Sequence, residues 1–354
     1  MRAAPATGHL LYSAPMSTLK FKDQSLTLMP YESVLDCLLR HGQGIPYACK
    51  AGMCQACLIR AVDCTADEVS RKWIKPELQA RGFTLACQWV PDADVAAALP
   101  SVEDFAQKVS LLRLTPLNDH VLKVELAFCD KGAKFTCRPG QYVTLSNPAG
   151  ISRSYSVAND YALDGTLVLH ISSTSHGLFT RWLFSEAAPG DFLYLRGPAG
   201  SCHYRADAGD QMPLLLAGNG TGLAPLYGIA CDALRRGHKG PITLIHGGRN
   251  AARLYMTDEL RALAAQHDNF RYVPCVQEAG TSKDLHSGDV ELVLEQYIRS
   301  LGKTFNSAQA QAFVCGSPEL VHALRKRLYL LGLRAANIQC DPFTERTVAP
   351  ATTT

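Results

Sequence analysis

Cys49-Lys50-Ala51-Gly52-Met53-Cys54-Gln55-Ala56-Cys57 is the stretch that decides the fold of the first part of this chain. With Cys87 further along, its cysteines follow the pattern C-x₄-C-x₂-C…C, the ligand spacing of plant-type [2Fe–2S] clusters. Iron–sulfur sites favour such soft thiolate ligands. Gly52 suits a loop that folds back on itself, because glycine adopts positive φ without steric cost. The spacing predicts that Cys49, Cys54, Cys57 and Cys87 hold a [2Fe–2S] cluster.

Two other interpretations of these cysteines are a structural zinc site and a set of unrelated buried thiols. Structural zinc sites usually take their cysteines as two short pairs. Here the fourth cysteine stands alone, in Leu85-Ala86-Cys87-Gln88. The pattern therefore favours the cluster over zinc.

The whole chain has the composition of a globular protein of two or three domains. It has 354 residues, of which 47% are hydrophobic and 19% charged, with a formal net charge of +3. This small charge gives no general affinity for nucleic acid. No apolar run reaches the roughly 18 residues of a membrane span, and Met1-Arg2-Ala3-Ala4-Pro5 lacks a hydrophobic signal core. We expect a cytoplasmic monomer.

The cysteine count also favours a reducing compartment. Thirteen cysteines are an odd number in a long chain without a secretory signal, so a disulfide framework is not expected. Those outside the cluster pattern are expected to be small buried residues.

The first domain is predicted over residues 18–98, after a leader at 1–17. Residues 18–29 alternate between apolar and polar side chains, which predicts a β-hairpin. Residues 33–40 have helical spacing between a Ser33 cap and Gly42. The Pro- and Ala-rich stretch 91–102 is expected to be an interdomain linker.

Two further domains and a tail are predicted after this stretch. Residues 103–206 carry short β-rich runs between Gly and Pro turns, which indicates a small antiparallel barrel. Over residues 207–345, continuous apolar strands alternate with helical segments, which predicts a doubly wound parallel α/β sheet. Residues 346–354 form the expected tail.

Four motifs in the second and third domains resemble one known family. They are Pro139-Gly140-Gln141-Tyr142, Arg153-Ser154-Tyr155-Ser156, Gly218-Asn219-Gly220-Thr221-Gly222-Leu223-Ala224-Pro225 and Cys315-Gly316. Together they resemble the ferredoxin–NADP⁺ reductase superfamily. The cysteine loop, which follows a hairpin and one helix as in β-grasp ferredoxins, narrows the resemblance to three-domain reductases that serve bacterial ring-hydroxylating oxygenases. The resemblance spans roughly residues 18–345.

The barrel motif fits a flavin dinucleotide, and FAD is expected rather than FMN. Arg153, followed by Ser154, can bind a diphosphate through its planar guanidinium. Tyr155 offers an aromatic face, and Ser156 a hydroxyl for the flavin N5 region where hydride arrives. The resemblance implies that Gly177 and Thr180, at a turn into a helix, hold the flavin diphosphate. In the family a basic residue often stands at the position of Ser172.

The glycine-rich turn after the apolar strand suits the pyrophosphate of NADH or NADPH at a helix N-terminus. The residues expected to contact the nucleotide are Gly218, Gly220, Thr221, Gly222, Pro225 and Arg249. Asn219 replaces a usual glycine of the family. Arg249 stands where the classical fingerprint expects an acidic residue, which leaves NADH and NADPH both open, with a slight preference for NADH. The resemblance implies that Cys315 and Gly316 meet the nicotinamide and that Phe343 packs on the flavin.

The expected function is electron transfer from NAD(P)H through FAD and a [2Fe–2S] cluster to a terminal oxygenase or another metalloenzyme. A flavin accepts an electron pair and releases the electrons singly, which joins hydride chemistry to a one-electron cluster. One alternative is a self-contained reductase of a quinone or ferric chelate. Another is a reductase of the type that acts on CDP-6-deoxy-glucoseen. A third is a zinc module fused to a nucleotide-sensing domain.

Overall fold

The computed structural model of the protein describes residues 16–343, apart from 48, 53–54, 102–103, 105, 131, 133–134, 175–176, 206–208, 279–283 and 303–304. The chain divides into two compact units, Met1–Phe105 and Ala106–Thr354. No helix in the part of the chain that is described combines the length and apolar character needed to cross a bilayer. The predicted tail and nearly all of the predicted leader lie outside the described residues.

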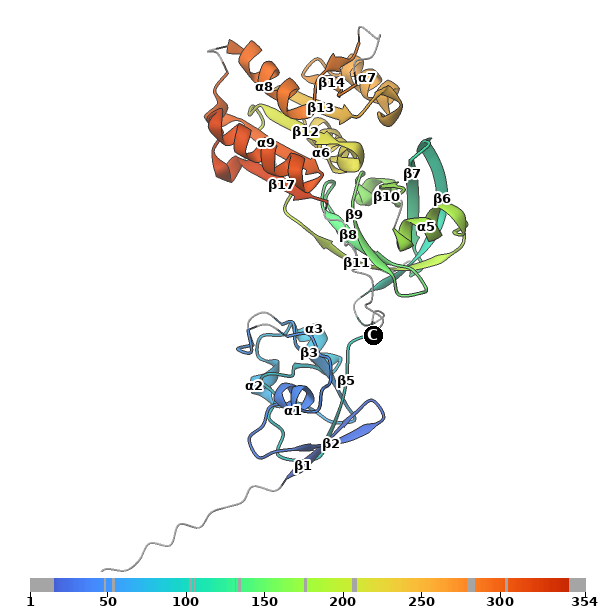
Figure 1. The fold of residues 1–354 in the computed structure, drawn as a ribbon, viewed down its shortest axis with the longest axis vertical. Helices are drawn as coiled ribbons and strands as arrows, with labels where there is room; N and C mark the ends of the chain where they lie inside the picture. Colours follow the sequence, from blue (N-terminus) through green and yellow to red (C-terminus); the bar gives the residue numbers. More distant parts are fainter. Residues whose placement is uncertain are drawn as a thin grey trace, which may run out of the picture. The chain divides into compact units, whose positions relative to one another are not determined.

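The first unit is a small mixed sheet with one helix packed on it (Figure 1). Its strands, in the sheet order β2-β1-β5-β3-β4, are β1 (Ser17–Phe21), β2 (Gln24–Leu28), β3 (Leu58–Val62), β4 (Phe83–Leu85) and β5 (Val95–Ala98). Its helices are α1 (Val34–Arg40), α2 (Glu68–Arg71) and α3 (Pro76–Ala80). β1 and β2 form the predicted antiparallel hairpin, and β1 pairs with β5 in parallel. This is the arrangement of a β-grasp ferredoxin.

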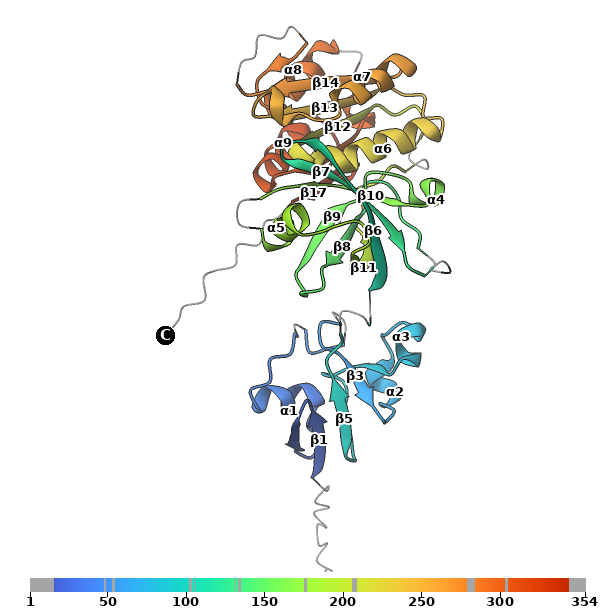
Figure 2. The same ribbon diagram turned by 90° about the vertical axis from the view of Figure 1, so that its right-hand side faces the viewer.

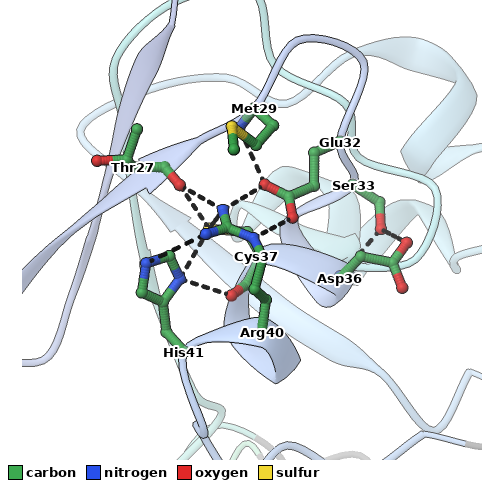
Figure 3. Close-up of polar contacts among 8 residues, drawn as sticks. All are labelled: Thr27, Met29, Glu32, Ser33, Asp36, Cys37, Arg40 and His41. Atoms are coloured by element: carbon green, nitrogen blue, oxygen red, sulfur yellow. Dashed lines mark hydrogen bonds and ion pairs between the residues drawn. The ribbon is translucent and has the colours of Figure 1, made fainter.

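Helix α1 begins and ends as the sequence predicts (Figure 3). The Ser33 hydroxyl caps the helix by accepting from the Asp36 backbone N–H at 3.1 Å. At the other end Arg40 binds the Glu32 carboxylate, with Nε 2.8 Å from Oε1, and donates to the carbonyl of Thr27 on β2 at 2.6 Å. These bonds fix the helix against the hairpin and so position the segment that leads into the cysteine loop.

The prediction of a linker over residues 91–102 is wrong for its central part. Residues Val95–Ala98 form β5, the central strand of the first sheet, which pairs with both β1 and β3. The physical reason is the small size of the alanines, which fit a strand with neighbours on both sides. Because alanine is depleted in strands, the composition of Val95–Ala98 did not indicate a strand.

The first half of the second unit is the predicted antiparallel barrel. Its strands are β6 (Gln107–Asn118), β7 (Val121–Phe128), β8 (Tyr142–Ser146), β9 (Ser152–Ser156), β10 (Leu167–Ser172) and β11 (Phe192–Ala199). They pair in the order β10-β7-β6-β11-β8-β9, and an antiparallel bridge between Val157 and Leu169 joins the two ends. Helices α4 (Tyr161–Asp164) and α5 (Leu178–Ser185) lie between strands in the sequence. Phe179 of α5 is fully buried in the barrel core.

The second half is the predicted doubly wound sheet. Its strands are β12 (Leu214–Asn219), β13 (Ile242–Gly248), β14 (Phe270–Val276), β15 (His286–Ser287), β16 (Gln311–Gly316) and β17 (Ile338–Pro342), all parallel and ordered β15-β14-β13-β12-β16-β17. Its helices are α6 (Leu223–Arg235), α7 (Thr257–Gln266), α8 (Val290–Ser300) and α9 (Pro318–Leu330). Helices α6 and α7 cover one face, and α8 and α9 cover the other (Figure 1).

Helix α6 also packs against the barrel, so the two halves share one interface (Figure 2). Gly228 on α6 lies so close to Ala158 and Pro139 that a methyl group there would be 2.9 Å from the Ala158 carbonyl oxygen. At Gly140, an added methyl would be 2.8 Å from the side chain of Ile229. The two glycines therefore permit a close approach of helix and barrel, which brings the carboxyl ends of the parallel strands to the barrel.

Candidate functional site

The cysteine loop of the first unit joins α1 to β3, and three of its four predicted ligands are described. Cys49 is exposed, Cys57 is buried directly before β3, and Cys87 is half-buried just after β4. Because β3 and β4 are antiparallel neighbours and the Ala86 N–H donates to the Cys57 carbonyl at 3.0 Å, Cys57 and Cys87 lie side by side. The fourth predicted ligand, Cys54, lies outside the described residues.

The loop is packed tightly around Gly52. Gly52 has φ +79°, and a methyl group there would be 3.2 Å from Gln88 and 3.3 Å from Trp73. The Ala51 N–H donates to Cys49 Sγ at 3.3 Å, which is the kind of hydrogen bond that tunes cluster sulfurs. Among the described residues, no three Cys, His, Asp or Glu side chains are grouped closely enough to hold a metal. The cysteine thiols and the Ala51 N–H are chemically suited to hold a [2Fe–2S] cluster.

The second unit contains a cavity of about 1030 Å³ between the barrel and the carboxyl ends of the parallel strands. Most of the predicted flavin and nucleotide residues line this one cavity. They are Arg153, Ser154, Tyr155, Ser156, Gly177, Thr180, Gly220, Thr221, Arg249, Gly316 and Phe343. The predicted residues that do not line it are Gly218, Gly222, Pro225 and Cys315.

Strand β9 supplies the barrel side of the cavity. It pairs with β8 in antiparallel register, and the Ser154 hydroxyl is 2.9 Å from that of Thr144 on β8. The ring of Tyr155 packs against Phe179, with centroids 5.5 Å apart, and burial raises the pKa of the Tyr155 hydroxyl. A neutral, fixed aromatic ring beside Arg153 therefore forms this wall.

The start of α5 supplies a second anchoring point. Gly177 is the N-cap of α5 and offers no side-chain oxygen to the first backbone N–H groups. An added methyl at Gly177 would meet the hydroxyls of Thr174 and Thr180, which are 3.0 Å from each other. The uncapped N–H groups and the two hydroxyls suit an anion such as a phosphate.

The glycine-rich turn after β12 forms the opposite wall and begins α6. Gly220, with φ +51°, and Thr221 face the cavity. Gly218 and Gly222 do not face it, and a methyl group on either would meet the Cys315 carbonyl oxygen of β16. These two glycines let the turn lie against β16, whereas Pro225 is buried in the first turn of α6.

The turn after β16 completes this wall, but its cysteine points elsewhere. The Cys315 thiol is fully buried and lies 3.7 Å from Cys202 Sγ. Gly316, with φ +136°, faces the cavity next to Asn219. The Asn219 side chain accepts from the Ser317 N–H at 3.2 Å, so the residue that replaces the family's usual glycine joins the two turns.

The carboxyl end of β17 brings a carboxylate to the flavin motif. The Ser156 hydroxyl donates to Asp341 Oδ2 at 2.9 Å, across 185 positions of sequence. Burial raises the pKa of Asp341, and the bond from Ser156 partly offsets this rise. Phe343 follows directly after β17 and donates its N–H to the Gly316 carbonyl at 2.8 Å. Ser156 and Phe343 therefore line the cavity, and Asp341 holds the Ser156 hydroxyl from behind the cavity wall.

The sequence matches known protein families along most of its length. Three family models match: the 2Fe-2S iron-sulfur cluster binding domain over residues 18–92, the oxidoreductase FAD-binding domain over 109–204, and the oxidoreductase NAD-binding domain over 215–326. The reductase subunit of an aromatic O-demethylase from Amycolatopsis is 30% identical over 325 residues, covering 89% of this chain and 95% of that protein. This chain belongs to the family of three-domain ferredoxin–NAD(P)H reductases.

Other members of the reductase family are similar over comparable lengths. The ferredoxin–NAD(P)⁺ reductase component of the naphthalene 1,2-dioxygenase system of Pseudomonas putida is 29% identical, covering 88% of this chain and 93% of that protein. The crystal structure of the Amycolatopsis cytochrome P450 reductase GcoB has a TM-score of 0.62 at 28% identity, covering 93% of this chain and 99% of that one. The ferredoxin reductase in carbazole 1,9a-dioxygenase has a TM-score of 0.58 at 26% identity, with the same coverage.

The reductase accordingly binds a [2Fe–2S] cluster, FAD and NAD(P)H. The described residues fit this set. The first unit holds the thiols, the barrel side of the cavity holds an arginine, an aromatic ring and an uncapped helix start, and the opposite side holds the glycine-rich turn.

Sequence reasoning missed the contacts of this reductase that join distant segments. No spacing rule in the sequence links Asp341 to Ser156, although the two side chains are hydrogen-bonded. Buried histidines make two further contacts of this kind: His170 lies 3.2 Å from the Tyr255 hydroxyl, and His246 lies 3.4 Å from the Tyr272 hydroxyl. Burial lowers the pKa of His170 to about 3 and that of His246 to about 4, so both rings are neutral at pH 7.

Proposed function

We propose that this reductase is the electron-supplying component of an oxygenase system, with NADH as the donor and a terminal oxygenase as the acceptor. The observation that carries the proposal is the single cavity lined by both β9 and the turns after β12 and β16. It brings a flavin motif and a nucleotide motif to one space, which direct hydride transfer requires. The relatives named above belong to O-demethylase, dioxygenase and cytochrome P450 systems.

The domain boundaries proposed are 18–98 for the cluster domain, 103–206 for the FAD domain and 207–345 for the nucleotide domain. When bound, FAD supplies the conversion of an electron pair from the nicotinamide into single electrons for the cluster. The protein binds and orients the flavin and the nicotinamide nucleotide, and it excludes water from the space between them.

On the barrel side, we assign the flavin diphosphate to Arg153 and to the start of α5 at Gly177 and Thr180. A guanidinium and free helix N–H groups both favour a diphosphate. Tyr155 and Phe343 present apolar rings that keep water from the reacting atoms. Asp341 accepts from Ser156 and so fixes the direction of the Ser156 hydroxyl.

On the other side, the turn at Gly220 and Thr221 is assigned to the pyrophosphate of the dinucleotide. Gly218, Gly222 and Pro225 support this turn from behind. We assign Gly316 to the nicotinamide end, and Cys315 acts through its backbone, because its thiol is buried against Cys202. Cys49, Cys54, Cys57 and Cys87 are the proposed cluster ligands.

We place the docking site of the acceptor at the cysteine loop. Lys50 has a half-exposed side chain that bonds Asp36 at 2.8 Å, and Tyr47 and Trp73 expose 47% and 54% of their surface beside the loop. Exposed aromatic and charged side chains near a redox centre suit a transient partner.

The charge of Lys50 provides the test of this docking site. Lys50→Glu should slow electron delivery to the acceptor several-fold, because rim charges act on association rates. NADH oxidation with ferricyanide should be unchanged. Lys22→Glu, at the hairpin turn between β1 and β2, is the matched control. Equal loss of both activities in the Lys50 variant would refute the docking site.

The oxygenase assignment is tested by stopped-flow reduction with NADH under anaerobic conditions, followed by mixing with a panel of terminal oxygenases of the O-demethylase and ring-dioxygenase kinds. The proposal expects at least one oxygenase to reoxidise the cluster and form product. Rapid turnover with quinone or ferric chelate, and none with any oxygenase, would support the self-contained reductase instead.

We infer that the reductase works as a cytoplasmic monomer. All seven cysteines of the second unit carry free thiols, as expected in a reducing compartment. Light scattering should give a mass near 38.4 kDa. A dimer mass, or recovery of the protein from an oxidising compartment, would contradict this inference.

A further inference from the structure

One end of the cavity is formed by the residues that follow β13. Gly247, Gly248, Arg249 and Arg253 line it there. In dinucleotide-binding folds, the residue at the carboxyl end of the second strand decides between NADH and NADPH, because an acidic side chain there binds the ribose 2′-hydroxyl. No acidic residue follows β13 directly, since the sequence continues Gly248-Arg249-Asn250.

An acidic side chain reaches this place from the next strand. β13 and β14 remain paired beyond their ends, because the Glu278 N–H donates to the Arg249 carbonyl at 2.9 Å and the Gln277 N–H to the Gly248 carbonyl at 3.2 Å. This pairing sets Glu278 beside Arg249. Gln277 lines the cavity, so the carboxylate lies one residue beyond the cavity wall.

Both oxygens of the carboxylate are held. Arg249 Nε donates to Glu278 Oε1 at 2.6 Å, and Asn250 Nδ2 donates to Oε2 at 3.2 Å. The bond from Arg249 keeps the pKa of Glu278 below its usual value, so the carboxylate is charged at pH 7. Glu278 therefore already balances the charge of Arg249, the cation that could otherwise bind the 2′-phosphate of NADPH.

NADH and NADPH would interact differently with the Arg249–Glu278 ion pair. A 2′-hydroxyl can donate to a carboxylate, whereas a 2′-phosphate carries about −1.5 to −2 charge at pH 7 and would be repelled by it. A phosphate would also compete with Glu278 for Arg249. Arg253 remains as a cation on the same wall and is the rival determinant.

We propose that Glu278, fixed by Arg249 and Asn250, is the residue that makes this reductase select NADH over NADPH. The proposal rests on the nucleotide site assigned above. The discriminating carboxylate then follows β14, whereas the fingerprint places it after the neighbouring strand β13.

The test is equilibrium binding to the loaded reductase by calorimetry, with 5′-ADP and adenosine 2′,5′-bisphosphate as probes. The native protein should bind 5′-ADP at least about tenfold more tightly, a difference of about 1.4 kcal/mol. Glu278→Gln keeps the size of the side chain and removes its charge, so it should bind the 2′-phosphate probe about tenfold more tightly than the native protein does. The ratio of kcat/KM for NADH and NADPH should shift in the same direction.

The controls separate the possible causes. Asp258→Asn removes a carboxylate of α7 that pairs with Arg261 at 3.4 Å and does not line the cavity, so it should leave the preference unchanged. An unchanged preference in Glu278→Gln would overturn the proposal, as would a native protein that binds both probes equally. A preference that changes only in Arg253→Gln would assign the role to Arg253. Failure of both probes to bind to the native protein and to Glu278→Gln would overturn the nucleotide site itself, and the proposal with it.

Discussion

The cysteine loop and the cavity of the second unit are built in opposite ways. The loop takes three predicted ligands from nine consecutive residues, and its described ligand Cys49 is exposed. The cavity takes its walls from β9, α5 and the carboxyl ends of the parallel strands, and Ser156 and Asp341 meet across 185 positions of sequence. A local, exposed site suits a group that must pass electrons outward. A site assembled from distant buried segments suits a reaction that must exclude water.

This comparison predicts that a change in the loop removes one activity and leaves the other. Cys57→Ser should abolish the cluster and all electron delivery beyond the flavin, since cluster assembly needs the thiolate. FAD content and NADH oxidation with ferricyanide should remain near native. Iron and sulfide analysis with a visible spectrum measures the effect, and Cys64→Ser, a half-buried thiol of the same unit, is the control. Full cluster content in the Cys57 variant would contradict the ligand assignment.

A change at the packed turn of the cavity should instead lower both activities together. A methyl group at Gly222 would meet the backbone of Cys315 and lie 3.1 Å from the Gly316 Cα, and backbone cannot move aside cheaply. We expect Gly222→Ala to weaken NADH binding by about ten- to a hundredfold, consistent with about 1–3 kcal/mol of overpacking. Gly44→Ala, which has nothing within 4 Å of the added carbon, is the control. Native nucleotide affinity in Gly222→Ala would refute the close packing.

The Asp341 carboxylate, which accepts from Ser156 on the cavity wall, should affect rate more than stability. Asp341→Asn should slow NADH oxidation about tenfold, since a hydrogen bond to a charged group contributes about 1.5–3 kcal/mol. Burial raises the native pKa of Asp341, so the native state binds this proton more tightly than the unfolded state does. The ionised form therefore costs stability as the pH rises above the ordinary value for aspartate.

Two measurements separate these effects for Asp341. Urea unfolding at pH 7 should show the Asn variant to be as stable as the native protein or more so, while stopped-flow flavin reduction shows the slower rate. A variant that loses stability and keeps the native rate would assign Asp341 a structural role only.

The smallest effect is expected from the buried histidines of the second unit. Their native pKa values, about 3 for His170 and about 4 for His246, lie below the ordinary 6.5, so the unfolded state binds these protons more tightly. Their contribution to stability is complete above about pH 6.5 and is lost as the pH falls toward the native values. Each proton adds a slope of up to about 1.4 kcal/mol per pH unit.

Unfolding between pH 4 and 7 measures this slope. His246→Gln should make it shallower, whereas the exposed His286→Gln should leave it unchanged. Equal slopes in the native protein and the His246 variant would contradict a neutral, buried imidazole.

The same contrast explains what sequence could predict. Contiguous signals predicted the hairpin, α1, the barrel, the parallel sheet and the residues of β9, because each depends on neighbours along the chain. The pairs Ser156–Asp341 and Arg249–Glu278 were not predicted, since only the sheet order brings their strands together. β5 was missed because its alanines carry no strand preference. The burial of the Cys315 thiol against Cys202 likewise depends on how β16 faces its neighbours.

The central claim is that the two sites act in series, with the flavin of the cavity between NADH and the cluster of the loop. The direct measurement is cluster reduction by NADH without oxygen, followed by electron paramagnetic resonance, in the native reductase and in protein stripped of FAD with its cluster intact. The account predicts that the cluster is reduced in the first and stays oxidised in the second until FAD is restored. Reduction of the cluster by NADH at the native rate in the flavin-free protein would contradict it.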